Sequence, residues 1–393
     1  VSDIVLSSAP LDEKLATFKT VIDDVIVNGA FEIMANTITL LLHKVGESNP
    51  ITRPAISYIV DSLANVTDDQ ELEKLCAHTL SLMRNKIMYY GDDCLTLSVL
   101  QSEVHQAKEE YSQAAKILAE VDLDHISEVA ARANLLLRIT ELYLADDDSV
   151  AASRYVLRAH RLIGQCANNT ALLVRHKSSY AQVLDAERKF QDAALRYLSL
   201  SQMDCPDLIS DTDQVIALQH AATCAILAGA GPSRSRVLAL LYNDPRARAL
   251  PNYAMLEAMH CNKIIGPEQQ TQFRELLKPH QNADLAGGST ILQRAVLEHN
   301  MLAVSKLYQN ISLSSLGKRL SISCEEAETV AALMIEQGRM HGIIDQVAQS
   351  IIFQDVNIKC PLGSWDDQIQ AFCSSLNSVA DNVADQIAVG RAT

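Results

Sequence analysis

The sequence predicts a mostly α-helical protein, in which a right-handed helical-repeat solenoid is followed by a winged-helix subdomain and a long C-terminal helix. Three observations predict this fold class. Glycine and proline are scarce, at 14 and 10 of 393 residues, whereas hydrophobic residues make up 48%, and few breakers with many aliphatic side chains favour helices. A motif recurs at helical-repeat spacing, and residues 289–353 pass from helical periodicity to two short β-branched segments.

Residues 11–100 show helical spacing with weakly marked boundaries. In the first helix the apolar side chains fall three or four residues apart, at Leu15, Phe18, Val21, Ile22 and Val25. Pro50 and Pro54 interrupt the next stretch, and a helix can restart at Ala55. Residues 67–70 form a capping box, with Thr67 as the capping residue of the following helix.

A motif of an anchor residue, an alanine three positions later and an apolar residue four positions after that occurs three times. The copies start 38 and 41 residues apart, as Tyr111/Ala114/Leu118, Ser149/Ala152/Val156 and Phe190/Ala193/Tyr197. The pattern is typical of the second helix of a helix–turn–helix repeat, because the alanine lets neighbouring helices approach closely. Such pairs stack to bury their apolar faces. We therefore expect a TPR-like solenoid over residues 1–200, with a chance match among alanine-rich helices as the alternative.

Residues 201–288 continue as a predicted helical bundle that contains a local group of arginines. The group consists of Arg234, Arg236, Arg246 and Arg248, and Asp244 is the only acidic residue between positions 232 and 250. The pattern favours a solvated helix face or an internal set of salt bridges, and it leaves an acidic protein partner open. A nucleic-acid surface is the remaining hypothesis for these side chains.

Residues 289–355 predict the winged-helix subdomain. Ser289 or Thr290 can cap its first helix and Ser312 or Ser314 its second. A capping box at 323–326 opens the third helix, and residues 343–346 and Ser350–Phe353 are the two wing strands. The third helix contains no lysine or arginine but carries Glu325, Glu326, Glu328 and Glu336. Negative charge opposes phosphate binding, so the subdomain predicts protein–protein assembly rather than DNA recognition.

Residues 362–393 predict one long terminal helix, strongest from 365 to 389, which would span about 37 Å at 1.5 Å per residue. Its apolar stripe is continuous and consists of Trp365, Ile369, Phe372, Leu376, Val379, Val383 and Ile387. A helix of this kind can pack against its own chain or join partner helices in a bundle. The pattern alone leaves both open.

Composition and missing motifs exclude several classes of function. The formal net charge of −15 disfavours nucleic-acid and anionic-membrane partners. The nine cysteines form no C-x-x-C pair and fit a reducing compartment, and the sequence lacks metalloprotease, hydrolase and phosphate-loop motifs. Residues 146–148, three aspartates, predict a solvated turn that caps Val150 onward rather than a metal site. We therefore expect no catalytic residue, no cofactor, no metal, and neither nucleic acid nor membrane as a partner.

Helical repeats followed by a winged helix and a long terminal helix resemble the PCI domain, which is shared by the proteasome lid, the COP9 signalosome and translation initiation factor three. The similarity to a signalosome subunit is carried by residues 230–244, 277–281, 294–300, 305–308 and 336–346. The Glu298-His299-Asn300 element and residues 305–308 also resemble a lid subunit. A PCI subunit of the proteasome lid is therefore the alternative.

The resemblance implies a non-catalytic scaffold subunit of the complex that removes a ubiquitin-like modifier from cullin–RING ligases. It implies PCI and MPN-type signalosome subunits as partners, the zinc isopeptidase centre on a different subunit, and a cytoplasmic and nuclear location. In this family winged helices associate edge to edge and terminal helices share a bundle. We therefore expect partner contacts along the terminal stripe and at an exposed strand edge at Ile351 and Phe353. The resemblance further implies that the solenoid touches the cullin–RING ligase.

Overall fold

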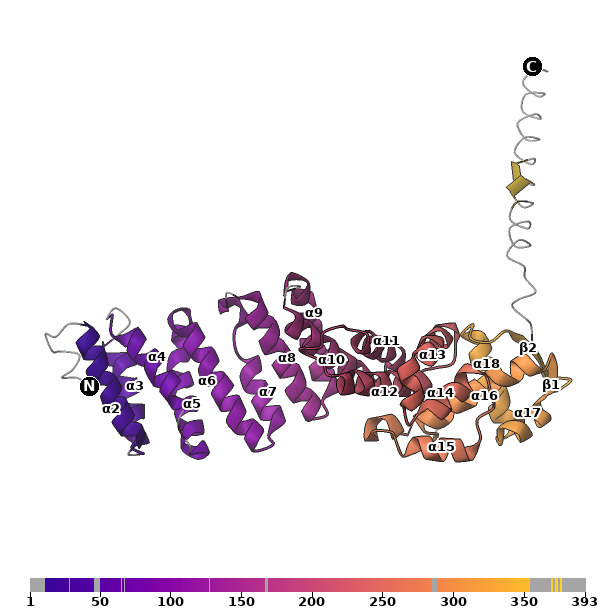
Figure 1. Ribbon diagram of the computed structural model, residues 1–393, viewed down its shortest axis with the longest axis horizontal. Coiled ribbons are helices and arrows are strands. Elements are labelled where there is room, and N and C mark those ends of the chain that lie inside the picture. The colour runs from indigo at the N-terminus through magenta and orange to yellow at the C-terminus, as the bar shows by residue number, and fades with distance from the viewer. Residues whose placement is uncertain are drawn as a thin grey trace, which may run out of the picture. The chain divides into compact units, whose positions relative to one another are not determined.

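The computed structural model describes residues 11–27, 29–45, 50–64, 66, 68–126, 128–166, 169–284, 288–353, and positions 369, 372, 373, 375 and 376. This part of the chain is mostly helical and has one three-stranded sheet (Figure 1). Two compact units divide the chain. The first comprises residues 1–228, 240–253 and 277–281, and the second comprises 229–239, 254–276 and 282–393. The predicted fold class, helical repeats followed by a winged helix, is confirmed.

Helices of the first unit follow one another in chain order (Figure 1). They are α2 (Leu11–Val27), α3 (Phe31–Leu40), α4 (Thr52–Leu63), α5 (Asp69–Met83), α6 (Ile87–Ala107), α7 (Tyr111–Ala119), α8 (Val129–Ala145), α9 (Ser149–Ile163), α10 (Thr170–Ala186), α11 (Phe190–Ser201) and α12 (Asp211–Leu227). Short helical turns add η1 (Leu41–Val45), η2 (Arg84–Lys86), η3 (Leu123–His125), η4 (Gly164–Cys166) and η5 (Pro245–Ala249). Helix α12 packs on α11, so the first unit extends past residue 200, where the sequence predicted the domain boundary.

The three copies of the repeat motif are the second helices of helical hairpins. Helices α7, α9 and α11 begin at the three anchor residues and pack on α6, α8 and α10, respectively. The motif alanines are fully buried, at Ala114, Ala152 and Ala193. A side chain larger than a methyl group would hold the neighbouring helix away. The repeat prediction is therefore confirmed.

One kind of turn precedes each motif helix. The residue two positions before the helix has left-handed backbone, with φ of 61°, 59° and 62° at Glu109, Asp147 and Arg188. The next N–H bonds the carbonyl five residues back, as in Lys189 to Leu184 at 2.8 Å, which closes the preceding helix as a Schellman motif. Gly29 makes the same turn before α3. The repeat thus reaches into the N-terminal region, where Met34 occupies the position of the motif alanine.

Two helix starts differ from the prediction. Helix α4 begins at Thr52 rather than Ala55, because Pro54 lies in the first turn, where the N–H that proline lacks has no intrahelical partner. Helix α5 is capped by Asp68, whose carboxylate accepts from the Gln70 N–H at 3.0 Å. The predicted capping residue, Thr67, lies outside the described residues.

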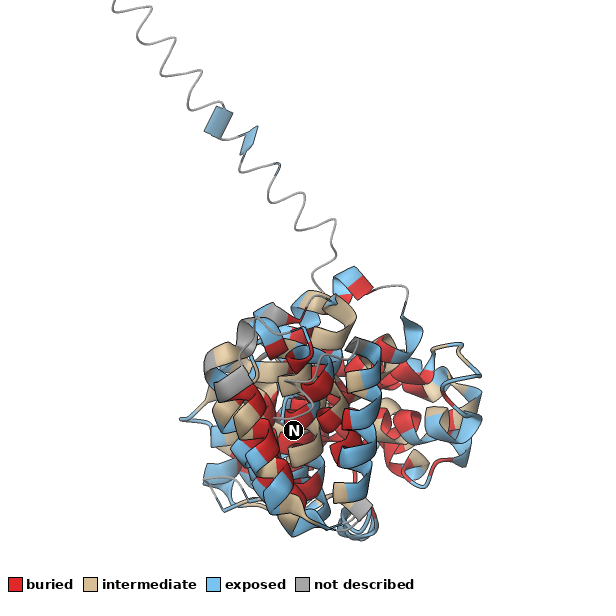
Figure 2. Ribbon diagram, turned by 90° about the vertical axis from the view of Figure 1, so that its left-hand side faces the viewer, coloured by how far each residue is buried: buried red, intermediate tan, exposed pale blue. Residues whose placement is uncertain are grey.

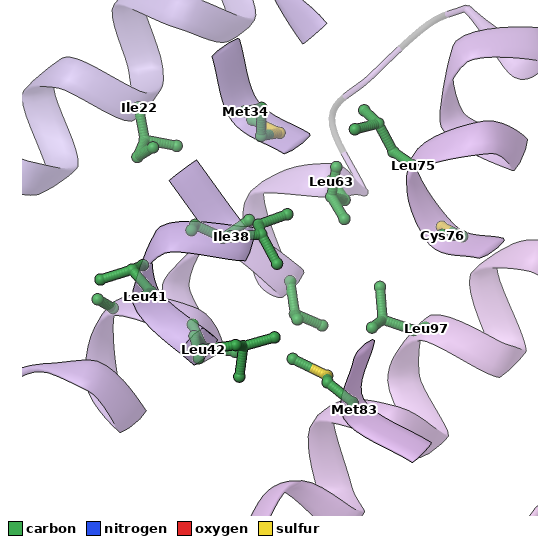
Figure 3. Packing of buried hydrophobic residues seen from close by; sticks show 14 of the residues in the cluster. Ile22, Met34, Ile38, Leu41, Leu42, Leu63, Leu75, Cys76, Met83 and Leu97 are labelled. Atoms are coloured by element: carbon green, nitrogen blue, oxygen red, sulfur yellow. The ribbon is translucent and has the colours of Figure 1, made fainter. Parts of the chain in front are cut away.

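Buried side chains of successive helices form the core of the first unit. Figure 3 shows residues of α2 to α6 converging in one cluster, among them Ile22, Ile38, Leu63 and Leu97. In the helices seen in Figure 2, buried and exposed residues mostly lie on different sides, whereas α12 is buried all round from Ala221 to Leu227. The cluster consists mainly of aliphatic side chains, so this core serves stability.

The second unit contains the winged helix. Helix α13 (Pro232–Asn243) begins in it, and it further contains α14 (Tyr253–His260), α15 (Pro267–Arg274), η6 (Pro279–Asn282, shared with the first unit), α16 (Ile291–Leu307), β1 (Asn310–Ser312), α17 (Leu313–Leu320), α18 (Cys324–Glu336), β2 (Gly342–Asp345) and β3 (Ser350–Phe353). Thr290, Ser312 and Ser323 cap α16, α17 and α18, which confirms the predicted helix starts. The strand β1 was not predicted, because three residues are too short to show an alternating pattern.

Candidate protein–protein interface

Three consecutive polar residues of α16 point into the second unit. Glu298, His299 and Asn300 are all buried. The Glu298 carboxylate accepts from both terminal nitrogens of Arg339 and from the Ala230 N–H at 3.1 Å. These contacts join α16 to the start of the wing and to the loop before α13.

The other two residues fix the segment after α14. The His299 ring Nε2 lies 3.0 Å from the Lys263 carbonyl oxygen. Asn300 accepts from the Ile265 N–H at 2.9 Å and donates to the Ile265 carbonyl at 3.0 Å. The Glu298-His299-Asn300 element therefore holds the fold together and offers no exposed chemical group.

Burial decides the charge states in this cluster. Burial alone raises the pKa of Glu298, but the Arg339 guanidinium and the other donors hold the pKa below its ordinary value. Burial lowers the pKa of His299 to about 4. Glu298 is thus a carboxylate and His299 a neutral imidazole near neutral pH, which is suited to structure and not to proton transfer with a ligand.

A second buried polar cluster lies in the first unit. The Asp185 carboxylate, 1% exposed, accepts from Gln281 Nε2 at 2.9 and 3.0 Å and lies 3.3 Å from His280 Nε2. Burial raises the pKa of Asp185, but the nearby His280 ring and the hydrogen bonds from Gln281 leave the pKa below its ordinary value. Residues 277–281, which carry part of the family resemblance, are therefore an anchor onto α10.

The four arginines between 232 and 250 do not form one basic surface. Arg234 is buried, and its Nη2 lies 2.8 Å from Met259 Sδ. Arg246 donates to the Asp244 carboxylate at 2.8 and 3.1 Å and to the Ser201 carbonyl at 3.0 Å. Only Arg236 and Arg248 are exposed. Burial and internal pairing of the other two argue against the nucleic-acid hypothesis.

The strand β3 is the middle strand of the sheet, in the order β1-β3-β2. Ile351 lies opposite both Ile311 and Ile344 and is fully buried, and Phe353 is also buried. The expectation of an exposed strand edge at Ile351 and Phe353 is therefore wrong. The unpredicted strand β1 covers the side of β3 that a two-stranded wing would leave open. In the described chain, the outer sides of β1 and β2 are the sheet's edges.

The outer face of the wing carries exposed apolar side chains that the sequence prediction missed. Ile343 of β2 and Ile352 of β3 lie opposite each other and are 54% and 43% exposed. Val347, in the turn, is 98% exposed. Asp345 shapes this turn by accepting from the N–H groups of Val347 and Ala348, both at 2.9 Å. The wing thus presents an apolar surface next to the edge strand β2.

The third helix of the winged helix has the acidic face that the sequence predicted. Glu325, Glu326 and Glu336 of α18 are exposed, and Glu328 accepts a hydrogen bond from Gln346 at 2.7 Å. A helix in the position of a recognition helix is therefore negatively charged. This surface does not suit a phosphate backbone.

The terminal stripe is described at three of its seven positions. Ile369, Phe372 and Leu376 have helical backbone and are 55%, 67% and 54% exposed. Trp365, Val379, Val383 and Ile387 lie outside the described residues, as does most of the predicted terminal helix. Exposed large apolar side chains at helical spacing are typical of a surface that a partner covers.

Among the described residues, no group of three His, Cys, Asp or Glu side chains is placed to hold a metal ion. The aspartates at 146–148 form a turn, and Asp148 caps α9 by accepting from the Ala151 N–H at 2.9 Å. Likewise, no helix in the described part of the chain is both apolar and long enough to span a bilayer.

Comparisons with known proteins agree with this architecture. A family model described as "PSMD12/CSN4, N-terminal" matches residues 7–207, and the PCI domain model matches residues 273–355. The chain is 36% identical over 341 residues to COP9 signalosome complex subunit 4 of Arabidopsis thaliana, covering 85% of each chain. It is 35% identical to the protein of that name from Drosophila melanogaster, over 85% of this chain and 81% of the other. For Dictyostelium discoideum the identity is 34%, over 88% and 87%. The chain belongs to the COP9 signalosome subunit 4 family.

Proposed function

We propose that this chain is a non-catalytic scaffold subunit of the COP9 signalosome, which supports removal of a ubiquitin-like modifier from cullin–RING ligases. One observation carries the proposal. The polar residues of the family-like stretches are buried in structural contacts, whereas large apolar side chains are exposed on the wing and at Ile369, Phe372 and Leu376. Exposed apolar surface of this kind favours association with other chains over chemistry.

The structure of the wing is an argument for contact with PCI-type and MPN-type sibling subunits. An edge strand has unpaired backbone groups that can bond a strand of another chain. Here β2 offers such an edge, and Ile343 and Ile352 lie beside it on the outer face. Ile351 and Phe353 take no part in this surface, because they form the core beneath it.

The terminal stripe supports a second contact, in a helical bundle formed with those siblings. Apolar residues three and four positions apart cover one side of a helix and pack between partner helices. The proposal includes Trp365, Val379, Val383 and Ile387 on the strength of their spacing alone. Contact between the solenoid and the cullin–RING ligase, and a cytoplasmic and nuclear location, rest on family membership.

Replacing Phe372 and Leu376 together by aspartate tests the bundle contact. We expect the variant to fold as the parent does but to lose its sibling subunits, because two charges cannot enter an apolar helix bundle without a large desolvation cost. The measurement is mass spectrometry of complexes purified through a tag on this chain. A matched control replaces Ile216 and Leu240, exposed apolar residues of the first unit, and should keep the siblings.

Two outcomes contradict the proposal. Retention of all siblings by the Phe372→Asp, Leu376→Asp variant would show that the stripe is not an assembly surface. Recovery of proteasome ATPases with the parent chain, instead of signalosome subunits, would assign the chain to the proteasome lid.

A further inference from the structure

The outward side of α9 carries a basic stripe. Arg154, Arg158 and Arg161 are exposed, and their spacing of four and three residues places them on one side of the helix. The opposite side is the buried one, formed by Ala152, Val156, Ala159 and Ile163. Because the helix is anchored through that buried side, the three arginines have a fixed direction outward.

These arginines are not neutralised by the chain itself. Residues 149–184 contain five lysines and arginines and no aspartate or glutamate, in a chain with a net charge of −15. Arg175 is paired with Glu141 at 2.5 Å, and Lys177 donates to Ser199 at 3.2 Å. The three α9 arginines form no salt bridge or hydrogen bond with any residue that the structure describes. They are therefore available to a partner.

Apolar side chains accompany the charges on the same side of α9. Val150 and Leu157 are 63% and 45% exposed and lie four and three residues from Arg154, within the same stripe. The Arg158 guanidinium lies 5.9 Å from the ring centre of Tyr155, which supports the side chain. A surface with both guanidinium groups and aliphatic side chains suits a ligand that is both acidic and apolar.

The neighbouring helices add further groups to this surface and set its limits. The Arg196 guanidinium of α11 lies 4.9 Å from the centre of the Tyr180 ring, and the His160 ring lies 5.6 Å from the same centre. Acidic side chains limit this surface at two places. One is the start of α9, at residues 146–148. The other is a cavity of about 150 Å³ that Asp122 and Asp124 line together with Arg158. The positive field is therefore strongest toward Arg161.

We infer that this α9 stripe, formed by Val150, Arg154, Leu157, Arg158 and Arg161, docks a carboxylate-rich amphipathic segment of another protein. Guanidinium groups bind carboxylates through two parallel hydrogen bonds. The arginines extend over about 10 Å of helix, which matches glutamates on two turns of a bound helix, and the two aliphatic residues accept its apolar side chains.

Duplex nucleic acid and anionic membranes fit the stripe less well. Their affinity comes from many cationic contacts at once, and three arginines are surrounded by a chain with a net charge of −15. The α9 stripe shares no residue with the wing or with the terminal stripe. The inference therefore goes beyond the proposed scaffold role and does not depend on it.

Fluorescence anisotropy of the full chain with a labelled peptide tests the inference. The probe is a three-heptad helical peptide with glutamate and leucine on one face, and its comparison peptide has glutamine in place of each glutamate. We expect Arg154→Glu, Arg158→Glu, Arg161→Glu together to weaken binding about tenfold or more, because three attractive charge pairs become repulsive. The glutamine peptide should lose a similar factor.

A matched variant controls for net charge. Arg188→Glu, Arg236→Glu and Arg248→Glu together change the charge equally at exposed positions that are not part of the α9 stripe, and they should weaken binding about twofold at most. Arg154→Gln, Arg158→Gln, Arg161→Gln removes attraction without adding repulsion and should weaken binding less than the glutamate variant. Leu157→Ser should also weaken binding, since it removes an apolar contact but no charge.

Three results overturn the inference. One is equal weakening by the α9 variants and the matched variant, and another is equal binding of the glutamate and glutamine peptides. The third is tighter binding of a 20-base-pair duplex or of phosphatidylserine vesicles than of the glutamate peptide, lost on changing the same arginines. Unaltered circular dichroism and melting temperature of each variant confirm that binding, and not folding, was changed.

Discussion

At the residue scale, the polar residues in the stretches that resemble the family make buried structural contacts. Glu298 joins Arg339 and the Ala230 N–H, and Asn300 holds both backbone groups of Ile265. A buried polar group without such partners would be costly. The sequence predicted none of these pairs, because the partners are 35 to 68 residues apart in the chain.

Removing the Arg339 side chain tests this account. Arg339→Ala leaves the Glu298 carboxylate, 3% exposed, without its main partner. We expect the free energy of unfolding to fall by about 3 kcal/mol, as is typical when one member of a buried ion pair is removed. Urea unfolding followed by circular dichroism measures the change.

The control for this prediction is Arg294→Ala. Arg294 contacts the same carboxylate at 3.2 Å, but its side chain is 48% exposed, so solvent screens the pair and the loss should stay below about 1 kcal/mol. Equal losses from the two variants would show that burial does not govern the strength of these contacts.

The wing shows how much of a strand's environment can be predicted from the pattern of its residues. Ile351 and Phe353 alternate with Ile352 along β3, so the sequence separates two faces of the strand. The face with Ile351 and Phe353 is the buried one because side chains of α16, α17 and α18 pack in the same cluster. The sequence prediction placed partner contacts at Ile351 and Phe353, which are buried, whereas Ile352 between them is exposed. A side-chain period of two turns any such error into a complete exchange of inside and outside.

At the element scale, the repeated hairpin accounts for the first unit. Each of the three motif hairpins closes with a left-handed residue and then starts a helix that packs through a buried alanine. Ion pairs link the first helices of successive hairpins, Glu103 to Arg138 at 3.0 Å and Glu141 to Arg175 at 2.5 Å. The alanine motif was visible in the sequence, whereas the left-handed turns were hidden because only Gly29 among them is a glycine.

Enlarging a motif alanine should destabilise the array. Ala152 is fully buried between helices, and Ala152→Leu would overpack the contact at a cost of about 1–3 kcal/mol. Thermal unfolding measures the effect. Ala332→Leu, the same change at an exposed position of α18, should leave the melting temperature nearly unchanged, and a comparable drop there would refute the packing argument.

Charging the outer face of the wing should disrupt assembly without unfolding the chain. Ile343→Lys with Ile352→Lys places two cations beside the β2 edge, and lysine there opposes pairing with another strand. We expect weaker recovery of sibling subunits in a pull-down, with unchanged circular dichroism. The buried counterpart, Ile351→Lys, should instead unfold the second unit. Full recovery of siblings by the double variant would exclude the wing from the interface.

At the scale of the whole molecule, each compact unit contains a buried neutral histidine. Burial lowers the pKa of His176, in the first unit, to about 4, and it does the same to His299 in the second. Both rings pack among other groups. The ring centres of His176 and His160 lie 5.2 Å apart, and His299 Nε2 lies 3.0 Å from the Lys263 carbonyl oxygen. Neither site takes up a proton easily in the folded chain.

Acid should therefore weaken both units. The folded pKa of each histidine lies below the ordinary value of 6.5, so the unfolded chain binds the proton more readily. The free energy of unfolding has its full value above about pH 6.5. It falls progressively as the pH decreases toward about 4, by on the order of 3 kcal/mol per histidine. Urea unfolding at pH 7 and pH 5 measures the difference.

Two substitutions assign this pH dependence. His176→Phe keeps an aromatic ring in the stack, and His299→Gln keeps a polar group near the Lys263 carbonyl, but neither side chain titrates. Each should reduce the loss of stability between pH 7 and pH 5. An unchanged loss in both variants would show that carboxylates, and not these histidines, control the response to acid.

By itself the sequence determined what depends on neighbours in the chain. Helical periodicity, capping residues such as Ser323 and the buried motif alanines are local, and they gave the helices, the repeat and the acidic third helix. The tertiary structure decided what depends on distant partners. It decided that β1 makes β3 the middle strand, that Arg234 and Glu298 are buried, and that Ile343 and Ile352 face outward. The reason is physical: burial is set by which other elements pack against a residue, and a single segment does not contain that information.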